Sequence, residues 1–254
     1  MYPTLLKIGS VSISSFSVMV LIAFLVAYYF CELEVVRKKA DRSLSDLLLI
    51  MSVLGGLGGA KLLFLYQNAT LSQVISDPLR YLSSGYTFLG GVTGAILLVF
   101  ILSRVKRISF WFLTDCCAPG LVIAYGIGRI GCFLVGDDYG IPTDLPWGMS
   151  FPHGAPPTIQ QVHPTQLYDT ILMLVLFYFL WSIRKKGTAN GWLTSITFIC
   201  IGIERFLIEY IRNTTPSFIP GISQAQLMSL VLILVGIIKL IQISLKTNKK
   251  PEWS

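Results

Sequence analysis

The stretch ISSFSVMVLIAFLVAYYF, residues 13–30, contains no charged side chain and is long enough to cross a bilayer as a helix. It is too long for the core of a signal peptide, and no small-residue cleavage pattern follows it, so we expect a retained membrane span. The whole chain has the same character, because 54% of its residues are hydrophobic and only 13% are charged. This composition excludes an ordinary soluble domain.

Apolar runs of similar length recur along the chain and predict an all-α membrane protein with about seven helices. The runs lie near residues 13–33, 46–66, 88–103, 110–130, 167–183, 191–211 and 222–245. The third run is short, and Pro119 with several glycines predicts a kink or break in the fourth. We interpret residues 1–254 as one membrane-embedded domain with an outer-face loop region at about 133–165.

Lysine and arginine are unevenly distributed between the loops, and this bias sets the direction of insertion. Most of the 20 basic residues follow the first, third, fifth and seventh runs. We therefore expect the N-terminus outside and the C-terminus in the cytoplasm. The net charge of +7 arises from these loop clusters, so it does not indicate a nucleic-acid partner.

Four basic residues go against this bias, because they lie in the predicted outer halves or at the outer ends of the helices. Acidic and polar residues accompany them. The basic residues are Lys61, Arg129, Arg205 and Arg212, with Asp137, Asp138, His163, Gln166, Glu204 and Glu209 on the same side. Ionisable residues at membrane depth are costly and usually face a protein interior or an aqueous cavity, so they indicate a functional site. The structural alternative is a set of buried ion pairs that fixes helix register.

The segment GIERFLIEYIR, residues 202–212, places three charged side chains at helical spacing. Arg205, Glu209 and Arg212 form one predicted stripe, in which Arg205 and Glu209 can pair directly. Glu204 lies about 100° away around a helix of 3.6 residues per turn and could face a different helix.

The segment GRIGCFLVGDDYG, residues 128–140, combines an arginine with glycines that let the backbone turn. A guanidinium matches two phosphate oxygens at once, which lysine cannot do. We therefore expect Arg129 to hold a lipid phosphate at the outer leaflet. Asp137 and Asp138 would balance its charge or position the attacking group.

Two glycine-rich segments allow another backbone to approach closely. For GGLGGAK, residues 55–61, we expect helix packing. For FLGGVTGA, residues 88–95, packing and ligand contact at Gly90 and Gly91 are equally compatible with the sequence.

GRIGCFLVGDDYG resembles the signature GR-x-G-N-F-x-N-x-E-x-x-G of the bacterial prolipoprotein diacylglyceryl transferases. HPTQLYD (163–169), DLPWGMSFP (144–152) and RFLIEYIR (205–212) are similar to three further segments of that family. The resemblance implies a multi-pass protein of the bacterial cytoplasmic (inner) membrane that acts among membrane lipids. Its reaction would move the diacylglyceryl group of phosphatidylglycerol to the lipobox cysteine of a prolipoprotein signal peptide, releasing glycerol phosphate, without a metal or another cofactor.

The same resemblance implies roles for individual residues. Arg129 and Arg205 would bind the phosphate-bearing head group, Glu209 would orient Arg205, and Asp137, Glu209 or water would deprotonate the thiol. The implied catalytic residues are Arg129, Arg205, Glu209 and Asp137, and the implied substrate-binding residues are Gly90, Gly91, Gly140, His163, Gln166 and Arg212. For His163, a structural role at a helix entrance is the alternative.

Several positions depart from the family pattern. Leu89 stands where the family usually has a histidine, Phe16 and Ile201 where it has tyrosines, Cys132 where it has asparagine, and Asp137 where it has glutamate. Leucine, isoleucine and phenylalanine cannot transfer protons. The thiolate of Cys132 could act as a nucleophile, although a small packed residue is the simpler interpretation.

These departures leave alternatives to thiol transfer. A divergent paralogue would keep the phospholipid site and use another acceptor. A membrane transporter would also place charges within a membrane, but it predicts internal repeats and charges near the midplane. We find no convincing repeat, and the charges cluster toward one leaflet.

Overall fold

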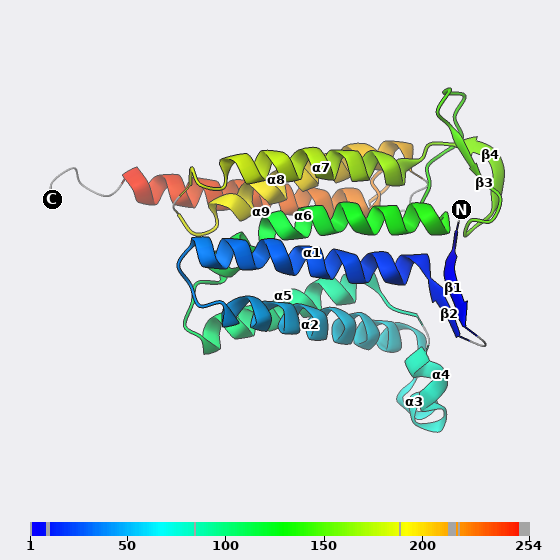
Figure 1. The fold of residues 1–254 in the computed structure, drawn as a ribbon, viewed down its shortest axis with the longest axis horizontal. Coiled ribbons are helices and arrows are strands. Elements are labelled where there is room, and N and C mark those ends of the chain that lie inside the picture. Colours follow the sequence, from blue (N-terminus) through cyan, green and yellow to red (C-terminus); the bar gives the residue numbers. More distant parts are fainter. Residues whose placement is uncertain are drawn as a thin grey trace. The chain divides into compact units, whose positions relative to one another are not determined.

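The computed structural model describes residues 2–8, 11–83, 85–187, 189–212, 217 and 219–248 (Figure 1). The structure is mostly helical, with 71% of residues in helices. The chain divides into two compact units, one formed by Met1–Cys31 with Asp115–Ser254 and the other by Glu32–Thr114. The single domain expected over residues 1–254 stays a prediction.

A helix occupies each of the seven predicted runs. The helices are α1 (Ser15–Arg37), α2 (Ser43–Asn68), α3 (Leu71–Ser76), α4 (Pro78–Ser83), α5 (Phe88–Val105), α6 (Phe110–Val135), α7 (Thr165–Ile183), α8 (Trp192–Ile208) and α9 (Gln224–Asn248), with a 3-10 turn η1 at Glu209–Ile211. Within the described residues, α1, α2, α6, α7 and α9 are long and apolar enough to cross a membrane. The shorter α5 and α8 have 18 and 17 residues, so seven crossings and the orientation of the termini stay predictions.

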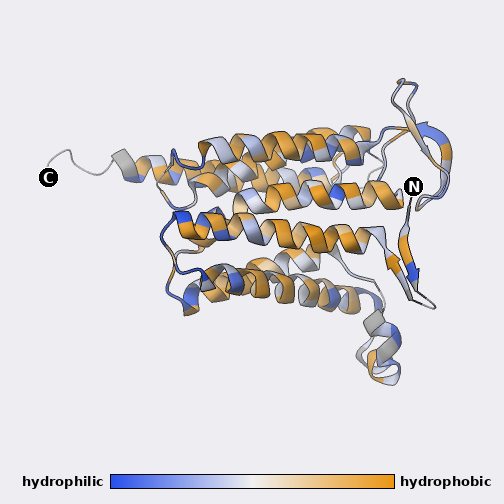
Figure 2. Cartoon of the chain, viewed as in Figure 1, coloured by the Kyte–Doolittle hydropathy of each residue, from blue (hydrophilic) through white to orange (hydrophobic). Residues whose placement is uncertain are grey.

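The outer surfaces of the long helices are apolar. Figure 2 shows hydrophobic residues along most of their lengths and hydrophilic residues gathered at the connections between them. Leu25 on α1, Val175 on α7 and Leu234 on α9 are all exposed. Helices with apolar exposed surfaces are suited to a lipid environment. A helix also satisfies its own backbone N–H and C=O groups, which lipid cannot do.

In the unit Glu32–Thr114, glycines bring α2 and α5 into backbone contact. A Cβ on Gly59 would collide with the carbonyl of Gly90, and a Cβ on Gly55 would collide with Gly94. Gly91 also faces α2, at Gly56. The packing expected for GGLGGAK is confirmed, and Gly90, Gly91 and Gly94 of FLGGVTGA take part in the same contact.

In the other unit, α6, α7 and α8 surround an apolar core. Its buried members are Ala118, Val122, Met173, Leu176, Phe177, Leu180 and Leu193. Of the kink or break predicted at Pro119, the break is wrong, because α6 continues through it as one helix of 26 residues, and the kink stays a prediction. A proline removes a single N–H donor, and packing on both sides of Pro119 keeps the helix continuous.

A buried carboxylate joins α6 to the start of α8. Asp115 accepts hydrogen bonds from the backbone N–H groups of Gly191 and Thr194, both at 2.8 Å, and from the Thr194 hydroxyl at 2.7 Å. The first N–H groups of a helix have no partner within the helix. A side chain on α6 therefore satisfies the beginning of α8.

Two small hairpins were not predicted from the sequence. β1 (Thr4–Ile8) pairs antiparallel with β2 (Val11–Ser14), and β3 (Met149–Phe151) pairs antiparallel with β4 (Thr158–Val162). The all-α class therefore holds for the helical body but not for these segments. They are too short to give a clear alternating pattern, and a two-stranded hairpin depends on its surroundings for stability.

Removing the carboxylate of Asp115 should destabilise the fold. In Asp115→Ala, two N–H groups and a hydroxyl at the start of α8 lose their acceptor inside the protein. We expect a loss of about 2 kcal/mol or more. Thermal unfolding in detergent measures it, with the exposed loop variant Asp144→Ala as control. Equal unfolding midpoints for the two variants would show that Asp115 does not hold α8.

Candidate active site at one end of α6, α7 and α8

The segment GRIGCFLVGDDYG forms the end of α6 and a tight turn. The N–H of Gly136 donates to the carbonyl of Cys132 at 2.8 Å, and Gly136 has a φ of 80°. Asp138 also has a positive φ, of 60°, a conformation that aspartate tolerates better than most residues. The turn carries two carboxylates back toward the arginine on α6.

Arg129 is fixed by acids from two different segments. Its Nε lies 2.5 Å from Oδ2 of Asp169 on α7, and its Nη1 lies 2.9 Å from Oδ2 of Asp138. The residue is only 5% exposed. Its Nη2 is buried and has no hydrogen-bond partner among the described residues. The guanidinium is therefore held in place while one donor remains available.

Asp138 connects Arg129 to a second arginine. Nη2 of Arg212 lies 2.9 Å from its Oδ1. Burial alone would raise the pKa of Asp138, but the charges of Arg212 and Arg129 outweigh burial and hold this pKa below its ordinary value. Asp138 is therefore ionised at neutral pH and bridges the two guanidinium groups.

The predicted charged stripe on one helix is partly wrong. Arg205 and Glu209 pair as expected, with Nη2 3.0 Å from Oε2. The helix, however, ends at Ile208, and Arg212 follows the 3-10 turn with an extended backbone. Because the chain has left the helix, Arg212 pairs with Asp138 on the loop instead of continuing the stripe.

Arg205 resembles Arg129 in its surroundings. Its partner Glu209 is buried and also accepts a hydrogen bond from the Ser223 hydroxyl at 2.9 Å. Nη1 of Arg205 is buried without a partner in the described part of the chain. Each of the two arginines assigned to the head group therefore keeps one unpaired buried donor.

Three residues assigned to substrate binding hold the loop between α6 and α7. Gln166 donates from Nε2 to the carbonyl of Asp137 at 2.5 Å, and Gly140 donates its N–H to the carbonyl of His163 at 2.8 Å. A Cβ on Gly140 would collide with the carbonyl of Ile211, so the loop closes only around a glycine. Nδ1 of His163 lies 3.3 Å from the Tyr168 hydroxyl. These contacts position the loop, and direct substrate contact stays a prediction.

Asp137 has the surroundings of a group that can exchange a proton. Its Oδ1 is buried without a partner among the described residues. Burial raises the pKa of Asp137 above its ordinary value, while a hydrogen bond with the Cys132 thiol acts in the opposite direction. The negative charge of Asp138 adds to the rise. Asp137 therefore holds its proton to a higher pH than an exposed aspartate.

The departures from the family pattern lie in different surroundings. Cys132 is buried, with Sγ 3.6 Å from Nη1 of Arg129. Ile201 packs against the apolar core, and Phe16 lies in the first turn of α1. Leu89, Gly90 and Gly91 belong to the unit Glu32–Thr114, where a substrate-binding role for the two glycines stays a prediction.

Sequence reasoning missed two members of this cluster, Tyr125 and Asp169, and did not place Glu204. Tyr125 interacts electrostatically with Asp169, Arg205, Arg129 and Glu204. Asp169 carried a recognisable signal, since it is the one acid in the apolar run 167–183. Tyr125 carried none, because a tyrosine in an apolar helix is ordinary.

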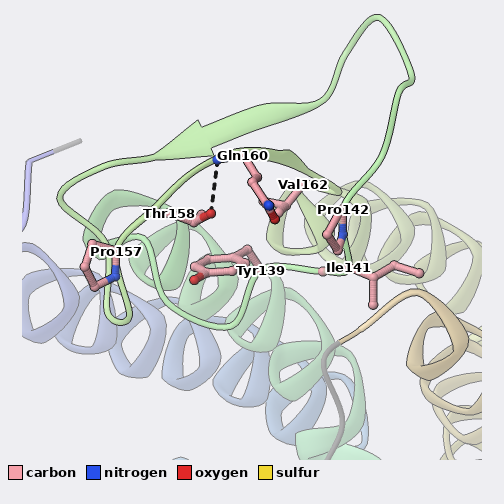
Figure 3. Close-up of a pocket in the computed structure, with 8 residues that line it drawn as sticks. Tyr139, Ile141, Pro142, Pro157, Thr158, Gln160 and Val162 are labelled. Carbon is pink, nitrogen blue, oxygen red and sulfur yellow. Dashed lines mark hydrogen bonds between the residues drawn. The ribbon is translucent and has the colours of Figure 1, made fainter.

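The loop between α6 and α7 also lines a hollow of about 310 Å³ (Figure 3). It is lined by Tyr139, Gly140, Ile141, Pro142, Pro157, Thr158, Gln160 and Val162. The Tyr139 ring stacks on Phe151, and its hydroxyl donates to the carbonyl of Pro156 at 2.8 Å. Among the described residues, no group of three or more histidine, cysteine, aspartate or glutamate side chains is arranged to hold a metal.

Comparison with known proteins gives the family. Residues 3–242 match the sequence model for prolipoprotein diacylglyceryl transferase. Three similar proteins are named phosphatidylglycerol–prolipoprotein diacylglyceryl transferase. That of Clostridium tetani is 29% identical, covering 93% of this chain and 96% of the relative. That of Bordetella avium is 31% identical, covering 98% and 97%, and that of Geobacter sulfurreducens is 31% identical, covering 95% of each. Because the match extends over nearly the whole chain, the protein belongs to the prolipoprotein diacylglyceryl transferase family.

Proposed function

We propose that this protein transfers the diacylglyceryl group of phosphatidylglycerol to the cysteine thiol of a prolipoprotein. The observation that carries the proposal is that Arg129 and Arg205 each keep one buried guanidinium donor without a hydrogen-bond partner in the described structure. Donors fixed in this way suit a phosphate oxygen, and carboxylates already hold both side chains in place. The names of the similar proteins support the same substrates.

The reaction requires stabilisation of a leaving phosphate. The thiolate sulfur attacks the glycerol carbon of the diacylglyceryl group, the S–C bond forms, and the C–O bond to phosphate breaks. The electron pair stays on the leaving glycerol phosphate. Arg129 and Arg205 stabilise the charge that develops there, in surroundings that need little reorganisation.

Asp137 is the best supported acceptor of the thiol proton. Glu209 is tied to Arg205 and to the Ser223 hydroxyl, so it serves to orient the arginine. Asp137 keeps a buried oxygen without a partner in the described structure. Gln166 and Gly140 would then contribute by holding the loop that carries Asp137, and Arg212 by fixing Asp138.

The acceptor would be the lipobox cysteine of a signal peptide, presented at the outer face of the bacterial inner membrane. Seven crossings with the N-terminus outside, as the sequence predicts, would put Arg129 near the outer leaflet, where phosphatidylglycerol is available. The departures at Leu89 and Ile201 keep a divergent paralogue with another acceptor as the second candidate. A transporter is less well supported, since Asp169, Asp138 and Glu209 hold the charges of this site in fixed pairs.

The deciding experiment mixes the purified protein with phosphatidylglycerol labelled in its diacylglyceryl group and a lipobox peptide. Label on the peptide cysteine supports the proposal, and a peptide with serine in place of that cysteine is the control. Label transferred to water or to another acceptor would establish the paralogue instead. Ion or solute flux without lipid turnover would establish the transporter.

Replacing Arg129 by lysine should abolish most of the activity. Lysine keeps the positive charge but cannot contact two acids and a phosphate oxygen from one planar group. We expect transferase activity to fall about 100-fold or more, with insertion retained. Arg42→Lys changes an exposed arginine in the same way and serves as the control. Activity of Arg129→Lys within twofold of the native protein would remove Arg129 from the phosphate site.

Asp137→Asn should change the pH dependence of kcat as well as its size. A base works only as the carboxylate, so the native activity should fall as the pH drops through the raised pKa of Asp137. Asparagine cannot accept the proton, so we expect kcat to fall about 100-fold. We also expect the decrease of kcat toward low pH, the acidic limb of the pH profile, to disappear. Asp144→Asn should retain the limb. A near-native kcat with the same limb in Asp137→Asn would assign the proton to another group.

A further inference from the structure

Two buried acids from different helices meet beside Arg129. Asp169 on α7 is completely buried, and one of its oxygens lies 2.5 Å from Nε of Arg129. Glu204 on α8 is within hydrogen-bonding contact of Asp169. Both carboxyl oxygens of Glu204 are buried, and neither has a hydrogen-bond donor among the described residues. The family motif RF-x-x-E-x-x-R begins at Arg205 and does not include Glu204.

The groups around Glu204 come from all three helices of the cluster. Asp169 faces Glu204 from α7, and Arg129 and Tyr125 interact with it from α6. Arg205 is the next residue of the same helix, α8. The arginines are engaged elsewhere, Arg129 with Asp169 and Asp138, and Arg205 with Glu209. The helix α9 also packs along α8, and its Lys239 interacts electrostatically with Lys246 and with Asp115.

The charges of the cluster are already balanced without Glu204. Three arginines, Arg129, Arg205 and Arg212, are paired with three acids, Asp138, Asp169 and Glu209. An ionised Glu204 would be a buried charge without a donor, which is strongly unfavourable. Two carboxyl groups in contact at low dielectric avoid this cost by sharing one proton.

We propose that Glu204 is a positioning residue that shares a proton with Asp169, and that this proton lets Arg129 and Arg205 hold an anionic lipid head group. The inference rests on the proposed function. It adds that the lipid head group binds only while Glu204 and Asp169 hold one proton between them. When the proton is lost at high pH, a further negative charge appears beside both arginines. Coulomb repulsion at this depth then weakens binding of the head group.

The KM for phosphatidylglycerol tests the proposal. Measured at saturating lipobox peptide, the native KM should rise with pH, approaching tenfold per unit for a single linked proton. Glu204→Gln has the same shape and cannot ionise, so its KM should stay within about twofold over the same range. Ionisation of the peptide thiol affects both proteins equally, because that group belongs to the peptide.

Asp144→Asn removes an exposed acid and should keep the native rise in KM. A rise in Glu204→Gln that parallels the native protein would overturn the proposal. A KM of the native protein that does not change between neutral and alkaline pH would overturn it as well.

A measurement on the native protein covers the case in which Glu204→Gln does not fold. In weakly buffered alkaline solution, adding phosphatidylglycerol vesicles should cause uptake of up to about one proton per lipid bound. Vesicles of zwitterionic phosphatidylcholine provide the control. Binding without proton uptake would overturn the shared proton. Proton uptake without transfer to the peptide would support the pair while overturning the proposed function.

Discussion

The ion pair between Arg129 and Asp169 is the contact on which the charged end of α6, α7 and α8 depends. A guanidinium buried in an apolar helix bundle is stable only with acids from neighbouring segments. Asp169 supplies one from α7, and Asp138 supplies the other from the turn after α6. Since Asp138 also pairs with Arg212, the same charges fix the loop and the chain that follows α8.

These pairs leave the site able to bind an anion. A guanidinium has five N–H donors, and its carboxylate partners occupy only part of this set. The remaining donors, Nη2 of Arg129 and Nη1 of Arg205, are buried, where a hydrogen bond to a charged oxygen is strong. The acids therefore orient the arginines and offset their charge, and the proposed lipid phosphate would complete the hydrogen bonding.

Sequence patterns predicted the positions of the helices better than the side-chain contacts between them. Apolar runs located the helices because the bilayer fixes their length, and the spacing of Arg205 and Glu209 predicted their ion pair. The same spacing failed for Arg212, since the change to a 3-10 turn is set by the loop it joins. Helical spacing predicted that Glu204 points in a different direction from Arg205. Only the packing of α7 on α8 shows that it faces Asp169.

The changes at the family's polar positions concern proton transfer more than anion binding. Arg129 contacts two acids and Arg205 contacts one, and the proposed phosphate would need a further donor from each planar guanidinium, which lysine cannot supply. A proton can be carried by any carboxyl group with suitable surroundings. Asp137, Asp169 and Glu204 provide three such groups around the retained arginines. Anion binding requires arginine at fixed positions, whereas a carboxyl group at any of several positions can carry a proton. Leu89 and Ile201 can therefore stand where the family usually has polar residues while the enzyme acts on a phospholipid.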